Sequence, residues 1–335
     1  MNWRALLSLR RYGILGMNAR NIGYISRYNE RRLYPLVDNK LKTKLLAAEH
    51  AIPTPDLRLV VRYQHQIRNI EQLLAGLQEF AIKPAKGAGG KGILIISGRK
   101  GKDFVKPSGA VLSLTDLKRH LSNILAGLYS LGGSPDIAII EDLIEADDRF
   151  DRYSYQGVPD IRIVVFKGYP IMAMLRLATR ASDGKANLHQ GAVGVGLDIA
   201  TGRCLNAVQH SRRLRVHPDT GASLASIEIP DWESLLRLAA GCYEMTGLGY
   251  LGADIVLDKR RGPQLLELNA RPGLAIQLAR GVGLLPRLRH IEALQAPHPT
   301  PEARVRYAME AFRGQATDIR IHAPAREEVA ETLSA

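Results

Sequence analysis

The sequence has few cysteines and no long apolar run, and each shortage argues against a class of protein. Its 335 residues include two cysteines, Cys204 and Cys242, which lie far apart and lack metal-ligand spacing. We therefore expect reduced, structural thiols in a cytoplasmic protein. No run approaches the roughly 18–20 apolar residues of a membrane span. Arg10 and Arg11 also arrive before the apolar core of a secretory signal could form.

Acidic residues are fewer than basic residues in this sequence. Lysine and arginine total 46 against 33 aspartate and glutamate, a formal charge of +13. This excess implies an acidic partner: a nucleotide, a nucleic acid, an anionic membrane surface or a carboxylate-rich substrate. Because no basic segment is rich in aromatic residues, as base stacking would require, we do not expect a nucleic acid.

The positive charge is concentrated near the start of the chain. Residues 1–32 hold seven arginines and one acid, Glu30. The first eleven residues interleave Trp3 and three leucines with arginines. They fit either a basic amphipathic helix that lies on membranes or a helix packed on the protein body. We favour the second interpretation because the apolar stripe is short.

Strand and helix patterns are mixed along the chain, with several hairpins, which favours an α+β architecture over a parallel doubly wound sheet. Residues 13–37 and the Gly- and Ala-rich stretch that ends at Leu197 read as loops. Strands are expected over residues 58–62, 79–84, 92–96, 137–141, 160–166, 169–176, 252–258 and 263–269. Helices are expected over residues 40–50, 67–77, 113–131, 231–246 and 302–312, with a poorly ordered tail from residue 313.

The last hairpin carries the strongest chemical signal. A four-residue loop, 259–262, would place Asp254 directly opposite Glu267, and Asn269 would share that face because side chains alternate along a strand. Two opposed carboxylates repel each other unless a cation lies between them. The oxygen donors suit Mg²⁺ that bridges to phosphates. The plain alternative is a hairpin with a polar solvent face.

A glycine-rich loop supplies a second signal. Lys83 ends one strand, and the loop that follows it contains Gly87, Gly89, Gly90 and Lys91 before the next strand begins. Glycines allow backbone N–H groups to approach an anion closely. The pattern is neither a P-loop nor a dinucleotide-binding turn. It predicts a hairpin lid over phosphates, the alternative being a flexible hairpin tip.

Together these motifs resemble the ATP-grasp superfamily over about residues 38–290. Ile82-Lys83-Pro84 with its glycine loop, Ile140 to Ile144, and Asp254 with Glu267-Leu268-Asn269 occur in that family's order. Asp160-Ile161-Arg162, Asn187 to Gly191 and Glu267 to Gly273 further resemble the α-L-glutamate ligase branch, the enzymes related to ribosomal protein S6 modification. The resemblance implies an ATP-grasp fold, two α+β subdomains that grip ATP between antiparallel sheets.

The resemblance also implies which residues hold ATP and its metal ions. Asp254, Glu267 and Asn269 would bind two Mg²⁺ ions, with Mn²⁺ as an alternative. Glu141 would accept from the adenine amino group, or be an ordinary surface residue at a strand end. The implied ATP contacts are Lys40, Lys83, Gly87, Gly89, Gly90, Lys91, Glu141, the backbone at Leu143, and Asp148 or Glu145 at the ribose.

A second implied group would act on the transferred atoms. Arg162, Arg176 and Arg180 would neutralise the γ-phosphate or a substrate carboxylate, although Arg176 and Arg180 could simply be solvated. Asn187 and His189 would lie at the transfer site, with a plain loop histidine as the alternative. Arg271, in a turn near Asn269, is a plausible anion contact.

The expected reaction joins a carboxylate to an amine through an acyl phosphate, releases ADP, and adds glutamate or a similar amino acid to a carboxylate or peptide acceptor. It needs no side-chain nucleophile, and no Ser-His-Asp or Cys-His arrangement is visible. The alternatives are a phosphotransferase on the same fold and a non-catalytic ATP- or nucleic-acid-binding module.

The expected division of the chain has four parts. These are a basic segment 1–38, a first subdomain 39–142, a second subdomain 143–292 and a C-terminal helix and tail 293–335. Segment 1–38 is too short for the N-terminal domain of typical family members. The acceptor would therefore be held by this segment, by a second subunit or by a partner protein.

Overall fold

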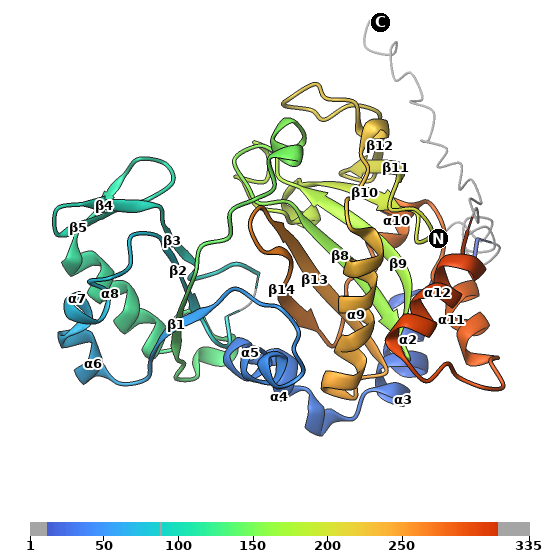
Figure 1. Cartoon of the computed structure of the whole chain (residues 1–335), viewed down its shortest axis with the longest axis horizontal. Coiled ribbons are helices and arrows are strands. Elements are labelled where there is room, and N and C mark those ends of the chain that lie inside the picture. Colours follow the sequence, from blue (N-terminus) through green and yellow to red (C-terminus); the bar gives the residue numbers. More distant parts are fainter. Residues whose placement is uncertain (1–11, 88, 314–335) are drawn as a thin grey trace, which may run out of the picture.

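The computed structural model describes residues 12–87 and 89–313. They form a smaller and a larger body, and each is built on an antiparallel sheet (Figure 1). Our predictions for residues 1–11 and for the tail beyond Arg313 lie outside the described residues. No helix of the described part of the chain is long and apolar enough to cross a membrane.

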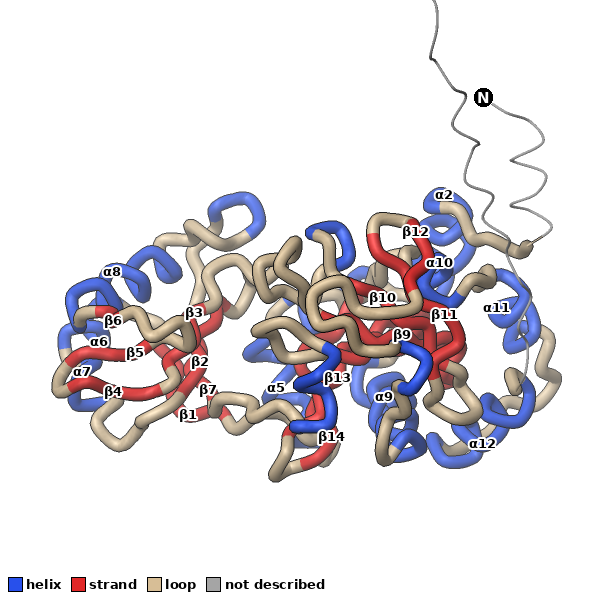
Figure 2. The backbone as a smooth tube through the Cα atoms, turned by 90° about the horizontal axis from the view of Figure 1, so that it is seen from above, coloured by secondary structure: helices blue, strands red, loops and turns tan. Residues whose placement is uncertain are grey.

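The smaller body has a four-stranded sheet in the order β1-β7-β2-β3. One face packs apolar residues such as Phe80 and Ile82 against α6, α7 and α8, which lie on the side away from the larger body (Figure 2). Its elements are β1 (Leu57–Val61), α6 (Gln64–Arg68), α7 (Ile70–Leu73), β2 (Phe80–Pro84), β3 (Leu94–Ile96), β4 (Gly98–Lys100), β5 (Asp103–Val105), β6 (Val111–Leu112), α8 (Leu114–Leu125) and β7 (Ala138–Glu141).

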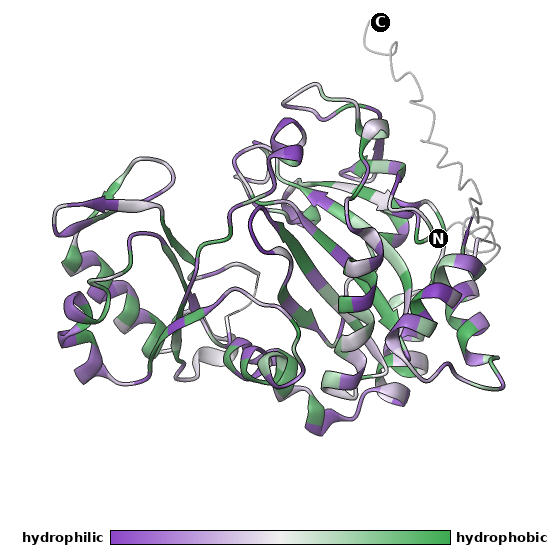
Figure 3. Ribbon diagram, in the orientation of Figure 1, coloured by the Kyte–Doolittle hydropathy of each residue, from purple (hydrophilic) through white to green (hydrophobic). Residues whose placement is uncertain are grey.

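The larger body has a seven-stranded sheet in the order β12-β11-β10-β9-β8-β13-β14. Hydrophobic residues run along its central strands (Figure 3), and the buried apolar face of α9 packs on them. Its elements are β8 (Asp160–Phe166), β9 (Tyr169–Leu177), β10 (Val193–Leu197), β11 (Cys204–Gln209), β12 (Arg212–Leu214), α9 (Trp232–Thr246), β13 (Tyr250–Asp258), β14 (Gly262–Asn269), α10 (Ile276–Arg280), α11 (Leu285–Glu292) and α12 (Pro301–Ala311).

The prediction of a loop over residues 13–37 is wrong. This stretch forms short helices that pack on the larger sheet, and Tyr24 meets Phe166 and Tyr250 with ring centroids 5.6 and 6.2 Å apart. Asn29 fixes the segment further: its amide donates to the carbonyls of Tyr250 and Ala270 at 2.7 and 3.0 Å, and its oxygen accepts from the Tyr250 N–H. The helices are α2 (Met17–Arg20), η1 (Asn21–Ile25), α3 (Ser26–Tyr28), η2 (Arg31–Leu33) and α4 (Pro35–Asp38).

Other element predictions are mostly confirmed. Asn39 caps α5 (Lys40–Glu49), and Ser113 caps α8. The helix expected over 67–77 is instead two short helices joined at Asn69. The loop expected up to Leu197 ends early, since residues 193–197 form β10 in the middle of the sheet. The strand was not predicted because it contains Gly194 and Gly196, and glycine is uncommon in strand interiors.

Candidate functional site

The second face of the smaller sheet carries a buried charge cluster. Ala81 pairs with Glu141 in the ladder, so Lys83, two residues along, lies on the same face as Glu141. The two carboxylate oxygens of Glu141 form ion pairs with Lys83 and with Lys44 of α5, the latter at 3.0 Å. Burial works to raise the pKa of Glu141, but the two ammonium groups outweigh it and hold that pKa below its usual range. Burial also lowers the pKa of Lys44.

An apolar cavity opens beside this cluster, between the two sheets. Its volume is about 190 Å³, and Lys40, Lys83, Glu141 and Glu267 lie at its edge. Most of its wall is hydrophobic and comes from both bodies: Ala81, Ile93, Ile95, Leu143, Ile144, Val158, Val256 and Leu266. Ile93 and Val158 are 40% and 38% exposed, although both are large and apolar. A flat apolar ring would cover these side chains.

Lys40 connects the glycine loop to the larger sheet. Its ammonium group donates to the Gly87 carbonyl at 2.6 Å and lies 3.6 Å from the Glu267 carboxylate. Its backbone N–H donates to Ala85 at the start of the loop. The loop joins β2 to β3 as a hairpin, as predicted, and Gly89 and Gly90 take positive φ angles of 63° and 76°. Lys91 lies exposed on this loop.

The predicted pairing of Asp254 with Glu267 is confirmed, but the predicted four-residue loop is wrong: Gly262 pairs with Asp258, and a register shift after Asp254 restores the predicted pairing. Asp254 of β13 lies directly opposite Glu267 of β14, and Asn269 donates to Asp254 at 3.4 Å. On the other side of β13, Asp254 lies opposite Arg162 of β8. Arg176 of β9 lies opposite Asp160 in the next row. Directly opposed residues share a face, so one face of the larger sheet carries a continuous group of charges.

Guanidinium groups compensate the carboxylates of this face. Arg162 donates to both oxygens of Asp254, at 2.7 Å from Nε, while Arg176 bridges Asp254, at 2.9 Å, and Asp160. Burial raises the pKa of Asp160 to about 6, against the effect of Arg176. For Asp254 burial acts in the same direction, but Arg162 and Arg176 outweigh it and hold its pKa below the usual range. Since Asp254 is buried, it depends on these partners.

The donors at this hairpin fit magnesium in part. Asp254, Glu267 and Asn269 offer carboxylate and amide oxygens from paired strands, the donor type that Mg²⁺ prefers. Within the described residues, no cluster of three or more His, Cys, Asp and Glu side chains could hold a metal alone. Any ion here would therefore take further oxygens from substrate phosphates and water, as Mg²⁺ commonly does. It would also displace an arginine from Asp254.

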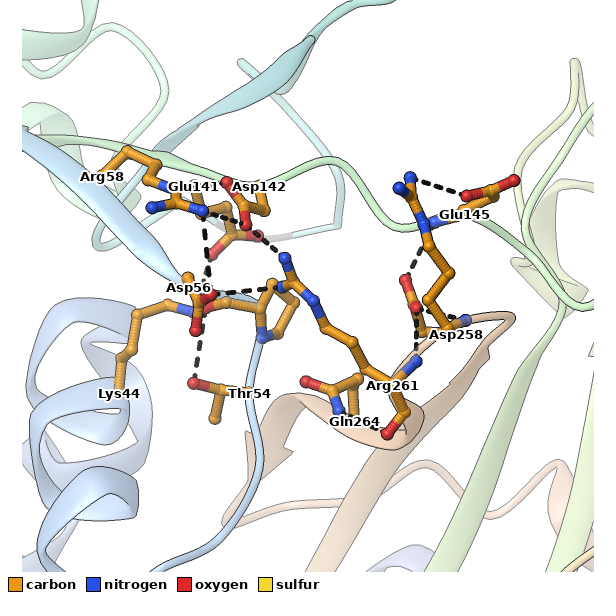
Figure 4. Close-up of polar contacts among 12 residues, drawn as sticks. Lys44, Thr54, Asp56, Arg58, Glu141, Asp142, Glu145, Asp258, Arg261 and Gln264 are labelled. Carbon is orange, nitrogen blue, oxygen red and sulfur yellow. Dashed lines mark hydrogen bonds and ion pairs between the residues drawn. The ribbon is translucent and has the colours of Figure 1, made fainter. Parts of the chain in front are cut away.

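A polar junction joins the two bodies beside the cavity (Figure 4). Arg58 of β1 and Arg261 of the β13–β14 turn both bind the carboxylate of Asp142. Arg261 also lies 3.5 Å from Asp56, and Asp258 accepts from the Glu145 N–H at 3.0 Å. The strand end that carries Glu141 is thereby tied to the hairpin that carries Asp254.

The proposed ribose ligands lie on this junction, toward solvent. Asp148 pairs with Lys259 at 2.6 Å and Glu145 with Arg260 at 2.7 Å. Side-chain exposures of 62% and 44% leave both carboxylates accessible. The structure brings both close to the same turn, so the choice between them stays open.

The remaining predicted residues lie around the charged face rather than in it. Arg180 is exposed and lies over the Tyr155 ring, 5.2 Å from its centroid. Asn187 caps the short helix η5 (Leu188–Gln190) by accepting from the His189 N–H at 3.0 Å. Arg271 lies over the ring of Tyr34, with Asp38 at 3.7 Å.

Two site residues escaped the sequence analysis. Lys44 lies one helical turn after Lys40, and this i, i+4 spacing was a usable signal. Asp160 could have been found as the register partner of Arg176 once the β8–β9 turn was placed at Lys167-Gly168. Neither residue has a neighbour in sequence that marks it as buried.

The sequence matches the family model described as sugar-transfer associated ATP-grasp over residues 19–293. The chain therefore belongs to this family, and the predicted ATP-grasp superfamily and α+β fold are confirmed. The match includes the N-terminal helices from residue 19 onward, which our estimate of the family region left out. The α-L-glutamate ligase branch stays a prediction.

Comparison with solved structures gives distant similarities. The ATP-grasp ligase PsnB complexed with minimal precursor is 16% identical (TM-score 0.41; 78% of this chain, 60% of that one). D-alanyl-alanine synthetase A from Vibrio cholerae is 10% identical (TM-score 0.45; 84% and 66%). D-cycloserine synthetase DcsG is 14% identical (TM-score 0.42; 88% and 80%). The chain thus spans less than two thirds of the first two. No curated protein matches the sequence.

Proposed function

We propose that this protein is an ATP- and Mg²⁺-dependent ligase that joins a carboxylate to an amine and releases ADP. The observation that carries the proposal is the position of Lys40, whose ammonium group contacts the glycine loop at Gly87 and faces Glu267 of the acidic hairpin. The Lys40 side chain thus lies between the apolar cavity and the charged face, where the phosphates of ATP would lie in this proposal. The family match supports the nucleotide part.

In this proposal the chain's own residues bind and orient the nucleotide. The adenine ring enters the apolar cavity, and Lys40 and Lys83 contact the phosphates. Asp254, Glu267 and Asn269 would hold Mg²⁺, which would supply positive charge to offset the charge of the phosphates. The glycine loop excludes the water that would hydrolyse an acyl phosphate.

The two arginines of the charged face supply the main electrostatic stabilisation. A carboxylate attacks the γ-phosphate, the bond to the ADP oxygen breaks, and an amine then displaces phosphate from the acyl phosphate. Arg162 and Arg176 already lie side by side and bind carboxylates bidentately, the geometry that also suits phosphoryl oxygens. We propose that they exchange Asp254 for the transferring group, so that catalysis rests on positioning and charge.

Glutamate or a similar amino acid is our proposed amine, and a carboxylate or peptide our proposed acceptor. Because the family is described as sugar-transfer associated, sugar acids and amino sugars belong in the same screen. The decisive experiment measures ADP release with pairs of these compounds and identifies the products by mass spectrometry. ADP release that requires both an acid and an amine, with an amide product, is the expected result. A stable phosphorylated product would contradict the ligase and support the phosphotransferase.

A further inference from the structure

A second cavity of about 310 Å³ lies on the larger body, apart from the nucleotide cavity. It is formed where η5, the β11–β12 turn and the start of α10 meet. Its lining combines apolar side chains, Leu188, Val208 and Leu278, with polar ones, His189, Gln209, His210 and Ser211, which we call the rim. Its volume reaches the lower end of the range for small-molecule sites, about 300–1,000 Å³.

This cavity lies on the charged face of the sheet. Gly194 of β10 is opposite Arg176 on one side and opposite Val208 on the other, so all three share a face. A Cβ on Gly194 would lie 2.8 Å from the Leu188 side chain, so Leu188 covers this position. Neighbouring strands are about 4.8 Å apart. Val208 is therefore about 10 Å from Arg176, within reach of one substrate that also touches the phosphate end.

The backbone of the turn that supplies the rim is unusual. Gln209 and Arg212 pair across it, so His210 and Ser211 form a two-residue turn with φ angles of 47° and 62°. Such turns favour Asn-Gly, because most other side chains are sterically hindered at positive φ. Both positions instead carry side chains that line the cavity. Backbone strain of this kind persists mainly where the side chains are used.

The chemistry of the lining indicates the ligand. Among the described residues that line it there is no Asp, Glu, Lys or Arg. Gln209 donates its amide N–H to the Gly191 carbonyl, at 2.8 Å, which fixes the position of its side chain. Imidazole, hydroxyl and amide groups thus line the cavity together with aliphatic side chains, of which Leu278 is 40% exposed. A pyranose ring has this complementary character, with hydroxyl groups at its edge and an apolar C–H face.

We propose that this cavity binds an uncharged sugar ring of the acceptor substrate. The inference rests on the proposed ligase, because it places that ring about 10 Å from the phosphate end. The reacting group of the acceptor would extend across β10, past Leu188 over Gly194, toward Arg176. His189, Gln209, His210 and Ser211 would select the ring by hydrogen bonds, and Leu188, Val208 and Leu278 would contact its apolar face.

The test uses a double substitution that removes two of the four polar side chains of the rim and gives the turn a favoured sequence. The double variant His210→Asn, Ser211→Gly creates the favoured turn sequence, so the fold should be at least as stable as wild type. Lys167→Asn is the matched control: Lys167 has a φ of 50° and precedes Gly168 in the β8–β9 turn. It makes the same kind of Asn-Gly turn away from the cavity.

Binding of neutral methyl glycosides and of neutral dipeptide amides is measured by titration calorimetry on the full chain with Mg²⁺ and a non-hydrolysable ATP analogue. At least one glycoside should bind, at least ten-fold more weakly to the double variant, with Tm kept or raised, and equally well to Lys167→Asn. No glycoside binding, better binding of dipeptide amides, or an unchanged Kd in the double variant would overturn the inference. Glycoside binding by a chain that never releases ADP would support the cavity and contradict the ligase.

Discussion

At the scale of single residues, the charged face is balanced before any substrate is bound. Asp160, Asp254 and Glu267 face Arg162, Arg176 and Lys40, three negative groups against three positive ones. Adding a nucleotide and a divalent cation must rearrange these pairs, because Asp254 has both oxygens engaged. Glu267 is the freest of the acids, with 35% of its side chain exposed and a single cation at 3.6 Å.

Glu267→Gln tests whether this carboxylate is needed for Mg-ATP turnover. It removes one negative charge from the proposed metal site, where charge stabilisation contributes several kcal/mol. We expect ADP release to fall at least a hundred-fold, with little change in Tm because the side chain is partly exposed. Steady-state ADP release at saturating Mg²⁺ and a thermal melt check both points.

The matched control is Glu228→Gln, the same chemical change at an exposed glutamate that pairs with Arg203. It should keep wild-type turnover. Wild-type turnover in Glu267→Gln itself would show that the metal assignment is wrong.

Glu141→Gln tests the buried cluster through its pH dependence. The folded-state pKa of Glu141 lies below its unfolded value of 4.5. The ionised carboxylate therefore contributes stability in full above pH 4.5, and the contribution is lost as pH falls through the folded pKa. Breaking a buried ion pair costs about 3–5 kcal/mol, so we expect a large loss at pH 7 and a smaller one near pH 3.

Urea unfolding between pH 3 and pH 7 measures this difference. Glu49→Gln is a control that makes the same chemical change, since Glu49 is exposed at the end of α5. It should change stability little at pH 7. An equal loss for Glu141→Gln across the whole range would contradict the role of its charge.

The sequence predicted the residues of the candidate site better than it predicted the ion pairs that these residues form. Asp254, Glu267 and Asn269 were predicted on one face because register and period follow from a short hairpin loop. The pairing of Glu141 with Lys44 could not be predicted. It depends on how α5 packs against the smaller sheet, and no local pattern encodes that distance.

At the scale of elements, the glycine loop is anchored at its end rather than free throughout. Gly92 has a φ of 75°, and a Cβ there would lie 2.5 Å from the Tyr129 ring. Gly90 has a nearly equal φ of 76°, and no atom of the described residues lies within 4 Å of such a Cβ. Substitutions at these two glycines therefore distinguish the energetic cost of a positive φ from the cost of a packing clash.

Gly92→Ala and Gly90→Ala form a matched pair. Both variants pay the cost of positive φ, about 1–2 kcal/mol, and only Gly92→Ala adds a clash, with overpacking typically costing about 1–3 kcal/mol. We expect Gly92→Ala to be less stable than Gly90→Ala and to raise the KM for ATP more, because the loop must move away from Tyr129. Unfolding measurements compare the stability of the two variants, and initial rates compare their KM for ATP. Equal effects of the two substitutions would contradict an anchor of the loop at Tyr129.

Long or strongly patterned elements were predictable, and glycine-rich or fragmented ones were not. The β8–β9 and β13–β14 hairpins have clear turns between apolar runs and were placed almost to the residue. The N-terminal helices have only three to five residues each. They are held by tertiary packing rather than by helix propensity, which local patterns do not record.

At the scale of the whole molecule, the two bodies have separate cores. One is centred on Phe80 and Phe104 and the other on Phe166 and Tyr250, with a small third cluster between them around Leu41, Ala85 and Ile139. The polar junction of Arg58, Asp142 and Arg261 adds contacts that are partly exposed and thus contribute little stability. Each core therefore has its own stability.

Asn29→Ala should destabilise the larger body alone. The substitution leaves the N–H and C=O of Tyr250 and the C=O of Ala270 buried without their Asn29 partner. Each unpaired buried group costs about 1–3 kcal/mol. Calorimetry should resolve two transitions, with only one lowered in Asn29→Ala. Asn18→Ala, at an exposed position of α2, should change neither.

Phe104→Leu supplies the complementary measurement, because Phe104 is buried only in the smaller core. It should lower the other transition and leave the first unchanged. Mg²⁺ with a non-hydrolysable ATP analogue should then raise both transitions and bring them together, since the nucleotide cavity is lined by both bodies. If each variant lowers both transitions equally without nucleotide, the two bodies unfold as one unit and their cores are coupled more strongly than the small shared cluster implies.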